Sequence, residues 1–244
     1  MFAHSQVYGE HLSSMLLGDG ERWLAVVTSD AYLDEAGTDA ASSLVTVAGF
    51  YGNKEQWLVF RELWKPHSSG FHAKSCDERF PNLCDAIEKS EIDGIFITLE
   101  KRTYKAMATE HMKSRLGNPY ALCAFQCVLT ICTEVKAPTA FVLEHGQPNL
   151  PFVRSLLEYM MDSGQFCIAA VTGARKGDFI ELHPADFVSH CASSHDTKWL
   201  QRLFDSHRLT HGHIGEKQLD GIGPELTALI KRAQRERLKA KKAR

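Results

Sequence analysis

The chain has 244 residues, of which 44% are hydrophobic and 24% are charged, as is typical of a globular protein with one large domain or two small ones. No apolar run approaches the roughly 18 residues of a membrane span, and the first ten residues lack the features of a secretory signal. Seven cysteines without a C-x-x-C pair do not make a disulfide framework. We therefore expect a cytoplasmic protein without a membrane partner.

The formal net charge of −2 conceals a basic C-terminal tail. Residues 231–244 carry eight Lys or Arg and the single acid Glu236, so the rest of the chain is acidic. Such a tail is either an electrostatic arm for phosphate backbones or a solvated helix end, whose cations favour the helix dipole. The sequence leaves both interpretations open.

The pattern of apolar residues predicts strands and helices that alternate along the chain. Strands are expected at 32–34, 43–50, 92–99, 139–144 and 167–171, and residues 23–27 are a further short strand or the lead into the first one. Helices are expected at 54–65, 80–89, 103–113 and 120–135, then from Pro151, from 182–186 and after Pro224. Residues 197–215 are His-rich and polar, as in a solvated loop. This order predicts an α/β domain with a mixed sheet covered by helices.

The domain organisation follows from these elements. Residues 1–28 are expected to form an N-terminal appendage, 29–215 the domain, and 216–244 a C-terminal helix with the basic tail. The helix at 54–65 has the clearest limits, because Asn53 is a suitable N-cap and Pro66 stops it. Its apolar residues at helical spacing are Trp57, Phe60, Leu63 and Trp64.

An acidic pair, Asp34 and Glu35, lies where the first strand meets a turn at Gly37. Because alternate residues of a strand share a face, Tyr32 and Asp34 should point one way while Leu33 and Glu35 point the other. Adjacent carboxylates are costly to desolvate unless a cation neutralises them. The pair therefore indicates either a divalent-metal site or a solvated hairpin turn, in which Asp and Gly are ordinary residues.

Three acids share this local context, since each lies where a regular element begins or ends. Asp34 and Glu144 end apolar strands, and Asp186 lies in the first turn of a helix. Carboxylate oxygens are the ligands that Mg²⁺ and Mn²⁺ prefer. Metal ions held in this way can activate water and stabilise the oxygens of a phosphodiester during cleavage.

Five short motifs, three of which contain these acids, follow one another along the chain in the order expected for a known family. They are DEAG at 34–37, FHAK at 71–74, NPY at 118–120, VLEHG at 142–146 and LHPAD at 182–186. Over residues 30 to 200 the series resembles a widespread bacterial and phage family, a domain of unknown function with a DESG-like start and an LQ-x-AD-like end. That family is similar to the ribonuclease H-like nucleases. The resemblance implies a ribonuclease H-like fold, with a central mixed sheet and the acids gathered at one edge of the strands.

The resemblance also implies a metal-dependent nuclease acting on nucleic acid. Asp34, Glu144 and Asp186 would hold Mg²⁺ or Mn²⁺, with Glu35 as an outer or alternate ligand. His72 and Lys74, from the FHAK motif, would orient the phosphate or the attacking water; His72 could instead cap or pack beside its neighbour.

Three positions depart from the family's pattern. Ala36 stands where a Ser is usual, and His183 replaces a Gln. Glu144 stands where Asp is common, which keeps the carboxylate but lengthens its reach by one methylene.

Other clusters offer competing interpretations. His183, Asp186 and His190 could share a helix face and bind Zn²⁺, although His190 also suits a buried, hydrogen-bonded position against the sheet. The expected alternatives to a nuclease are therefore a zinc hydrolase at these three residues and a non-catalytic module that binds nucleic acid or protein. The remaining His and Cys groups favour a solvated loop and a hydrophobic core, respectively: His207, His211 and His213, and Cys123, Cys127 and Cys132.

Overall fold

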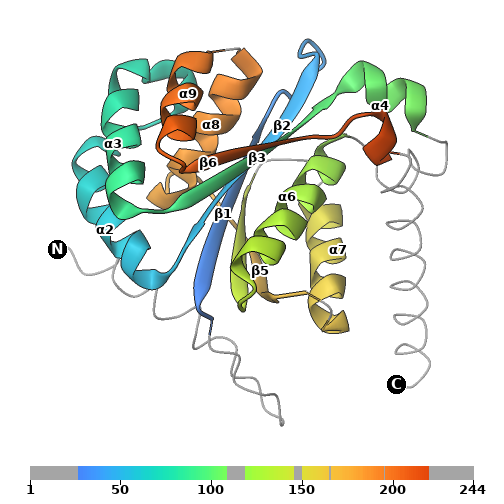
Figure 1. The fold of residues 1–244 in the computed structure, drawn as a ribbon, viewed down its shortest axis with the longest axis horizontal. Coiled ribbons are helices and arrows are strands. Elements are labelled where there is room, and N and C mark those ends of the chain that lie inside the picture. Colours follow the sequence, from blue (N-terminus) through green and yellow to red (C-terminus); the bar gives the residue numbers. More distant parts are fainter. Residues whose placement is uncertain (1–26, 109–118, 146–149, 165, 195, 220–244) are drawn as a thin grey trace, which may run out of the picture.

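A six-stranded mixed sheet with helices on both faces forms the centre of the molecule (Figure 1). The computed structural model describes residues 27–108, 119–145, 150–164, 166–194 and 196–219. In these ranges the strand order is β5-β4-β1-β2-β3-β6. The strands are β1 (Ser29–Ala36), β2 (Leu44–Gly52), β3 (Asp93–Glu100), β4 (Thr139–Glu144), β5 (Ile168–Ala174) and β6 (Leu209–His213).

The directions of the strands bring several chain segments to one edge of the sheet. β1, β2 and β3 form an antiparallel meander, whereas β4 runs parallel to β1 and β5 runs parallel to β4. Leu33 of β1 pairs with Leu143 of β4, so Asp34 and Glu144 follow at the same level. The carboxyl ends of β1, β4 and β5 therefore meet, and the predicted α/β class with a central mixed sheet flanked by helices is confirmed.

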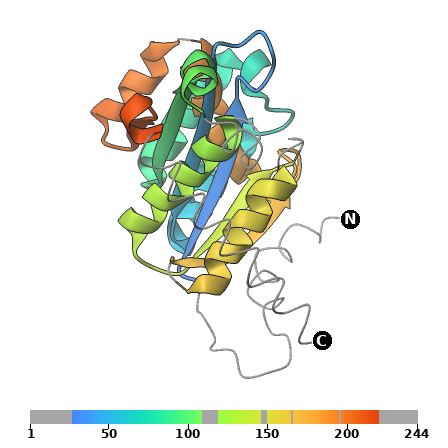
Figure 2. The ribbon, with the colours of Figure 1, turned by 90° about the vertical axis from the view of Figure 1, so that its right-hand side faces the viewer.

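Helices pack on both faces of the sheet. In Figure 1, α6 and α7 lie on one face, and α2, α3, α8 and α9 lie on the other. Figure 2, turned by 90°, brings the α6 and α7 layer toward the viewer. The helices are α2 (Lys54–Trp64), α3 (Phe80–Ser90), α4 (Lys101–Met107), α6 (Pro119–Val135), α7 (Leu150–Ser163), α8 (His183–Ser194) and α9 (Thr197–Asp205).

Local sequence explains how several elements begin and end. Asn53 and Gln56 form a reciprocal capping box at the start of α2, in which each side chain accepts the other's backbone N–H. β1 ends at a turn in which Gly37 has φ +74°, and a Cβ there would lie 2.0 Å from the Leu44 carbonyl oxygen. Only glycine fits that turn, so the residues after the acidic pair are fixed by backbone geometry.

The two faces of β1 belong to different hydrophobic clusters, as the strand alternation predicts. Tyr32 packs in the cluster beneath α2, α3 and α8, whereas Leu33 packs in the cluster beneath α6 and α7. The three cysteines of α6 are buried in the second cluster, which confirms that they are core residues. Asp34, on the Tyr32 side of the strand, thus faces α8.

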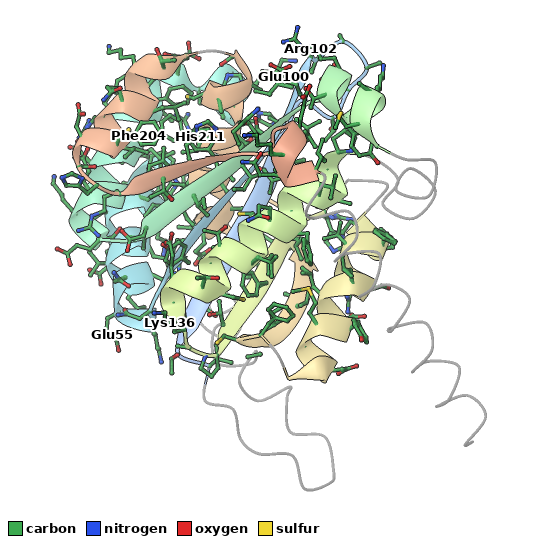
Figure 3. The ribbon with its side chains drawn as sticks, turned by 45° about the vertical axis from the view of Figure 1, so that its right-hand side comes forward. Glu55, Glu100, Arg102, Lys136, Phe204 and His211 are labelled. Atoms are coloured by element: carbon green, nitrogen blue, oxygen red, sulfur yellow. The ribbon has the colours of Figure 1, made fainter. Side chains whose placement is uncertain are left out.

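In segment 197–215, the solvated loop predicted for His207, His211 and His213 is wrong for His211 and His213. This segment forms α9 and the edge strand β6, which pairs in parallel with β3. Phe204 of α9 and His211 of β6 lie beside each other at this edge (Figure 3), and the His211 ring stacks on Phe96 of β3 at a centroid distance of 4.4 Å. These polar-looking residues are therefore held by contacts with β3, which lies more than a hundred residues earlier in the sequence.

Several predictions fall on parts of the chain outside the described ranges. The appendage, most of the strand-like segment at 23–27, the final helix and the basic tail lie there, so the boundaries 1–28 and 216–244 stay predictions. The helix expected at 103–113 corresponds to α4, which begins at Lys101 and ends at Met107. In the described ranges, no helix combines the length and the apolarity that a bilayer crossing requires.

Candidate metal centre

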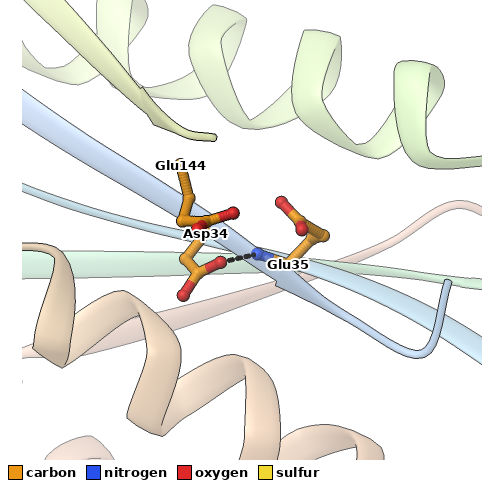
Figure 4. Close-up of side chains that lie close together, drawn as sticks. All are labelled: Asp34, Glu35 and Glu144. Atoms are coloured by element: carbon orange, nitrogen blue, oxygen red, sulfur yellow. Dashed lines mark hydrogen bonds between the residues drawn. The ribbon is translucent and has the colours of Figure 1, made fainter. Parts of the chain in front are cut away.

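Three carboxylates converge at the ends of two neighbouring strands (Figure 4). Asp34 and Glu35 come from β1, and Glu144 ends the parallel strand β4. One oxygen from each of the three lies within 4.8 Å of the others. Asp34 is buried, while Glu35 and Glu144 are half-buried. The three acids thus lie around a common point at the partly exposed ends of these strands.

Asp34 occupies the most desolvated position of the site. Its Oδ1 accepts the Glu35 backbone N–H at 2.8 Å. Its Oδ2 is buried and accepts no well-aligned hydrogen bond, although the Lys176 ammonium lies 2.8 Å away. Burial raises the pKa of Asp34 to about 7, Lys176 opposes this rise, and the charge of Asp186 adds to it. The ionised form of Asp34 therefore calls for more positive charge than Lys176 supplies.

Asp186 reaches the site from the first turn of α8, but both of its oxygens are already engaged. Oδ1 lies 2.8 Å from Lys176 Nζ, and Oδ2 accepts the Ala73 backbone N–H at 2.9 Å. Because Lys176 is equally close to Asp34, the two carboxylate oxygens that it bridges lie no farther apart than twice that distance. Asp186 is thus near Asp34 without belonging to the group of Asp34, Glu35 and Glu144.

Glu144 stands in an electrostatic environment like that of Asp34, but it is less buried. Burial raises its pKa, Lys176 opposes the rise, and Asp186 adds to it. His72 and His145 are also near enough to favour its ionised form. Glu144 is longer by one methylene than the Asp that is common at this position in the resembled family. Its carboxylate nevertheless lies near those of the other two acids.

The segment at 71–74 contributes to the site chiefly through its backbone. Phe71 is buried and His72 is exposed, and the His72 ring accepts the Lys74 backbone N–H at 3.3 Å. Lys74 is also exposed. The contact with the acids is made instead by the Ala73 amide, which fixes Asp186. The side chains of His72 and Lys74 are left at the solvent side of this turn.

His183 has a structural partner on each side. Its Nδ1 accepts the Trp64 indole N–H at 2.9 Å, and the ring also makes a hydrogen bond to the backbone of Lys176. Burial lowers the pKa of His183 to about 4, so the ring is neutral. His190 is half-buried rather than buried. Among the described residues, these two histidines do not form a metal-binding group with Asp186.

Two further groups from the sequence are separate from the acids. Burial raises the pKa of the thiols of Cys123, Cys127 and Cys132, which are therefore poor nucleophiles. His211 and His213 both contact Thr98 Oγ1, at 2.9 and 3.0 Å, beside a cavity of about 650 Å³. None of the acids of the metal centre lines this cavity.

Lys176 and the Ala73 amide are the site components that the sequence reasoning missed. The position of Lys176 in the sequence could have indicated its role, because it follows the end of β5 by two residues. Asp34, Glu35 and Glu144 lie in the same way at the ends of β1 and β4. Parallel neighbouring strands bring their carboxyl ends together, so a lysine at that position was a candidate partner for the acids. The Ala73 amide had no such signal, since backbone groups leave no mark in the sequence.

The residues of the centre fit a divalent ion. Hard oxygen ligands suit Mg²⁺ and Mn²⁺, and the three converging side chains offer carboxylate oxygens only.

Comparisons with known proteins identify similar folds. No family model matches the chain, and no curated protein matches it. Among solved structures, Bst ribonuclease HIII in complex with Mn²⁺ has a TM-score of 0.48 at 16% identity, over 74% of this chain and 56% of that one. Ribonuclease HII from Archaeoglobus fulgidus, solved with PCNA, has a TM-score of 0.46 at 14% identity, over 82% and 88%. Ribonuclease H2 from Pyrococcus horikoshii has a TM-score of 0.45 at 11% sequence identity, over 72% of this chain and 77% of that one. The match thus spans little more than half of the Bst enzyme, and the likeness concerns the fold alone.

Proposed function

We propose that the chain is a metal-dependent phosphodiesterase that cleaves nucleic acid, with Mg²⁺ or Mn²⁺ bound by Asp34, Glu35 and Glu144. One observation carries the proposal: three carboxylate oxygens lie within 4.8 Å of one another at the ends of two parallel strands. Asp34 is buried and the other two are half-buried, and a buried carboxylate is costly unless it is paired or binds metal. The motif series that resembles ribonuclease H-like nucleases supports the same reaction class.

Each side chain has a role that follows from its contacts. A divalent ion at this site would activate water and stabilise the negative charge on the phosphate oxygens. The Glu35 amide fixes the Asp34 carboxylate, so this ligand is oriented before any substrate arrives. Asp186 holds Lys176 and the Ala73 amide in place, and thereby positions the turn at 71–74. We assign to His72 and Lys74, which are exposed on that turn, the contact with a phosphate or with the attacking water.

The substrate we propose is a nucleic acid, and the solved structures with similar folds are ribonucleases, one of them with Mn²⁺. An acidic body with acidic metal ligands repels a polyanion. The basic residues at 231–244, which lie outside the described ranges, would offset this repulsion and hold the substrate near the site.

The role of the tail has its own test. If the tail neutralises phosphates, a chain ending at Ile230 should bind nucleic acid more weakly and with a flatter dependence of log K on log salt concentration. Fluorescence anisotropy with a labelled oligonucleotide at several salt concentrations measures both. Equal affinity and equal slope with and without the tail would assign it to a solvated helix end.

Cleavage is tested with single- and double-stranded DNA, RNA and a hybrid, each with Mg²⁺, Mn²⁺ or Zn²⁺. We expect cleavage with Mg²⁺ or Mn²⁺ that is lost in Asp34→Asn and kept in Asp205→Asn, a matched change at an exposed aspartate of α9. Cleavage that survives Asp34→Asn would contradict the proposal.

Two other outcomes would point to the alternatives from the sequence. Binding of nucleic acid without cleavage under any condition would favour a non-catalytic module. Activity with Zn²⁺ alone would favour a zinc hydrolase, although the described residues do not bring His183 and His190 together with Asp186.

A further inference from the structure

Lys176 lies between the two most buried acids of the centre. Its Nζ is 2.8 Å from Asp34 Oδ2 and 2.8 Å from Asp186 Oδ1. Only 21% of its side chain is exposed, while the Asp34 and Asp186 side chains are 0% and 6% exposed. Two carboxylates this close to one cation are the arrangement that a bridging metal ion would otherwise produce.

The position of Lys176 is set by the turn that follows β5. Near it, Trp64 donates its indole N–H to the buried His183. The neighbouring carbonyl of Arg175 accepts the backbone N–H groups of Asp178 and Phe179, at 2.9 and 3.3 Å. This turn therefore carries Lys176 into the site on a rigid support.

Asp186 is fully occupied by protein donors when Lys176 is in place. Its Oδ1 faces the ammonium, and its Oδ2 accepts the Ala73 amide. A metal ion bridging Asp34 and Asp186 would have to displace Lys176 and leave a buried ammonium without its partners, which is costly. With Lys176 between Asp34 and Asp186, the location that remains for a metal ion is the one between Asp34, Glu35 and Glu144.

We propose that Lys176 is a permanent cation of the site, taking the place between Asp34 and Asp186 that a second divalent ion would occupy, so that the protein binds one divalent ion. This inference rests on the proposed metal site at Asp34, Glu35 and Glu144. It makes Lys176 and Asp186 positioning residues, which supply fixed positive charge and hold the Asp34 ligand. The centre would then combine one ion and one ammonium.

The number of bound ions tests the inference without reference to activity. Metal-free protein is titrated with Mn²⁺, and free Mn²⁺ is followed by electron paramagnetic resonance. We expect one ion per chain for the wild type and two for Lys176→Met, which removes the charge but keeps an unbranched side chain. Lys89→Met is the matched control, because Lys89 is 64% exposed and lies 3.7 Å from Asp85 on α3; it should bind one ion.

A second readout protects the test against a variant that does not fold. Two Mn²⁺ ions about 4 Å apart are magnetically coupled, so the spectrum of wild-type protein saturated with Mn²⁺ should show a single uncoupled ion. A coupled pair in the wild type, or one ion in a folded Lys176→Met, would overturn the role of Lys176 while leaving the metal site intact. Absence of Mn²⁺ binding in both proteins would overturn the proposed function itself.

Discussion

Two buried groups of charged residues lie along the same face of β1, and they are balanced in different ways. Near the start of the strand, Asp30 and Tyr32 lie beside the ion pair of Arg61 with Glu181. Near its end, Asp34 lies beside Lys176 and three further acids. The connection from β5 to α8 serves both, since it supplies Glu181 to the first group and Lys176 to the second.

The difference between the two groups separates a structural role from a functional one. In the first group the Arg61 guanidinium pairs with the buried Glu181 and also favours the ionised form of the half-buried Asp30, as expected of a contact that holds α2 against the connection. In the second group one ammonium, that of Lys176, lies between two buried carboxylates, Asp34 and Asp186. Net negative charge in a buried position costs stability unless a further cation offsets it, so we expect this group to persist because it binds a metal ion.

The largest effect is expected from Asp34→Asn. The change keeps the size of the side chain and its acceptor for the Glu35 amide, but it removes a ligand charge. Metal ions contribute several kcal/mol to such reactions, so cleavage should fall about a thousandfold. The free energy of unfolding at pH 8, measured with denaturant, should stay unchanged or rise. A loss of activity that comes with lost stability would mean that Asp34 serves the fold instead.

The opposite result is expected from Arg61→Met. Removing this guanidinium leaves Glu181 unpaired and buried, which should lower the free energy of unfolding by about 3 kcal/mol, since one partner of a buried ion pair is lost. Mn²⁺ binding should not change. Adding Glu181→Gln should restore part of the stability, and Arg154→Met, in an exposed pair on α7, should cost less than about 1 kcal/mol. Weaker Mn²⁺ binding in Arg61→Met would show that the two groups are coupled.

A smaller effect is expected in the pH dependence of stability of the metal-free protein. Because the pKa of Asp34 is raised from 3.8 to about 7, the folded state holds a proton between these values that the unfolded state has released. This group therefore favours folding at pH 4, and its contribution is lost as the pH rises toward 7, by roughly 1.4 kcal/mol for each pH unit. Denaturant unfolding across pH 4 to 8 in a chelator should show this loss in the wild type and not in Asp34→Asn. If the free energy of unfolding changed with pH to the same extent in the two proteins, the raised pKa of Asp34 would be contradicted.

His183 should give a pH dependence of the opposite sign. Its pKa is lowered to about 4, so the unfolded state binds a proton below pH 6.5 that the folded state does not. Stability should therefore fall as the pH falls from 6.5 to 4, and His183→Gln should lose this component. Comparison of Asp34→Asn and His183→Gln with the wild type separates the contributions of Asp34 and His183 to the pH dependence of stability.

The sequence predicted those parts of the fold that local patterns determine. Asn53 and the helical spacing of Trp57, Phe60 and Trp64 located α2 to within a residue. Alternation along β1 placed Tyr32 and Leu33 in different clusters. β6 was missed because its stability depends on pairing with β3, and a short edge strand rich in His and Gly has little apolar alternation of its own.

In the candidate site, too, the sequence predicted what local patterns determine and missed what tertiary contacts determine. Acids at the ends of strands were visible in the sequence, because strand ends can be located from the apolar pattern. What the sequence could not give was the partner of each acid. Asp186 was predicted as a metal ligand, and that role stays a prediction; in the structure it contacts Lys176 and the Ala73 amide. Those contacts depend on how a connection and a turn pack against α8, which is a tertiary property.

The most direct test of the central claim is a crystal structure of the protein with Mn²⁺, measured at a wavelength where the ion scatters anomalously. We expect one anomalous peak about 2 Å from oxygens of Asp34, Glu35 and Glu144, with the Lys176 ammonium still between Asp34 and Asp186. A fully occupied crystal without a peak at these three acids, or with peaks only at His211 and His213, would contradict it.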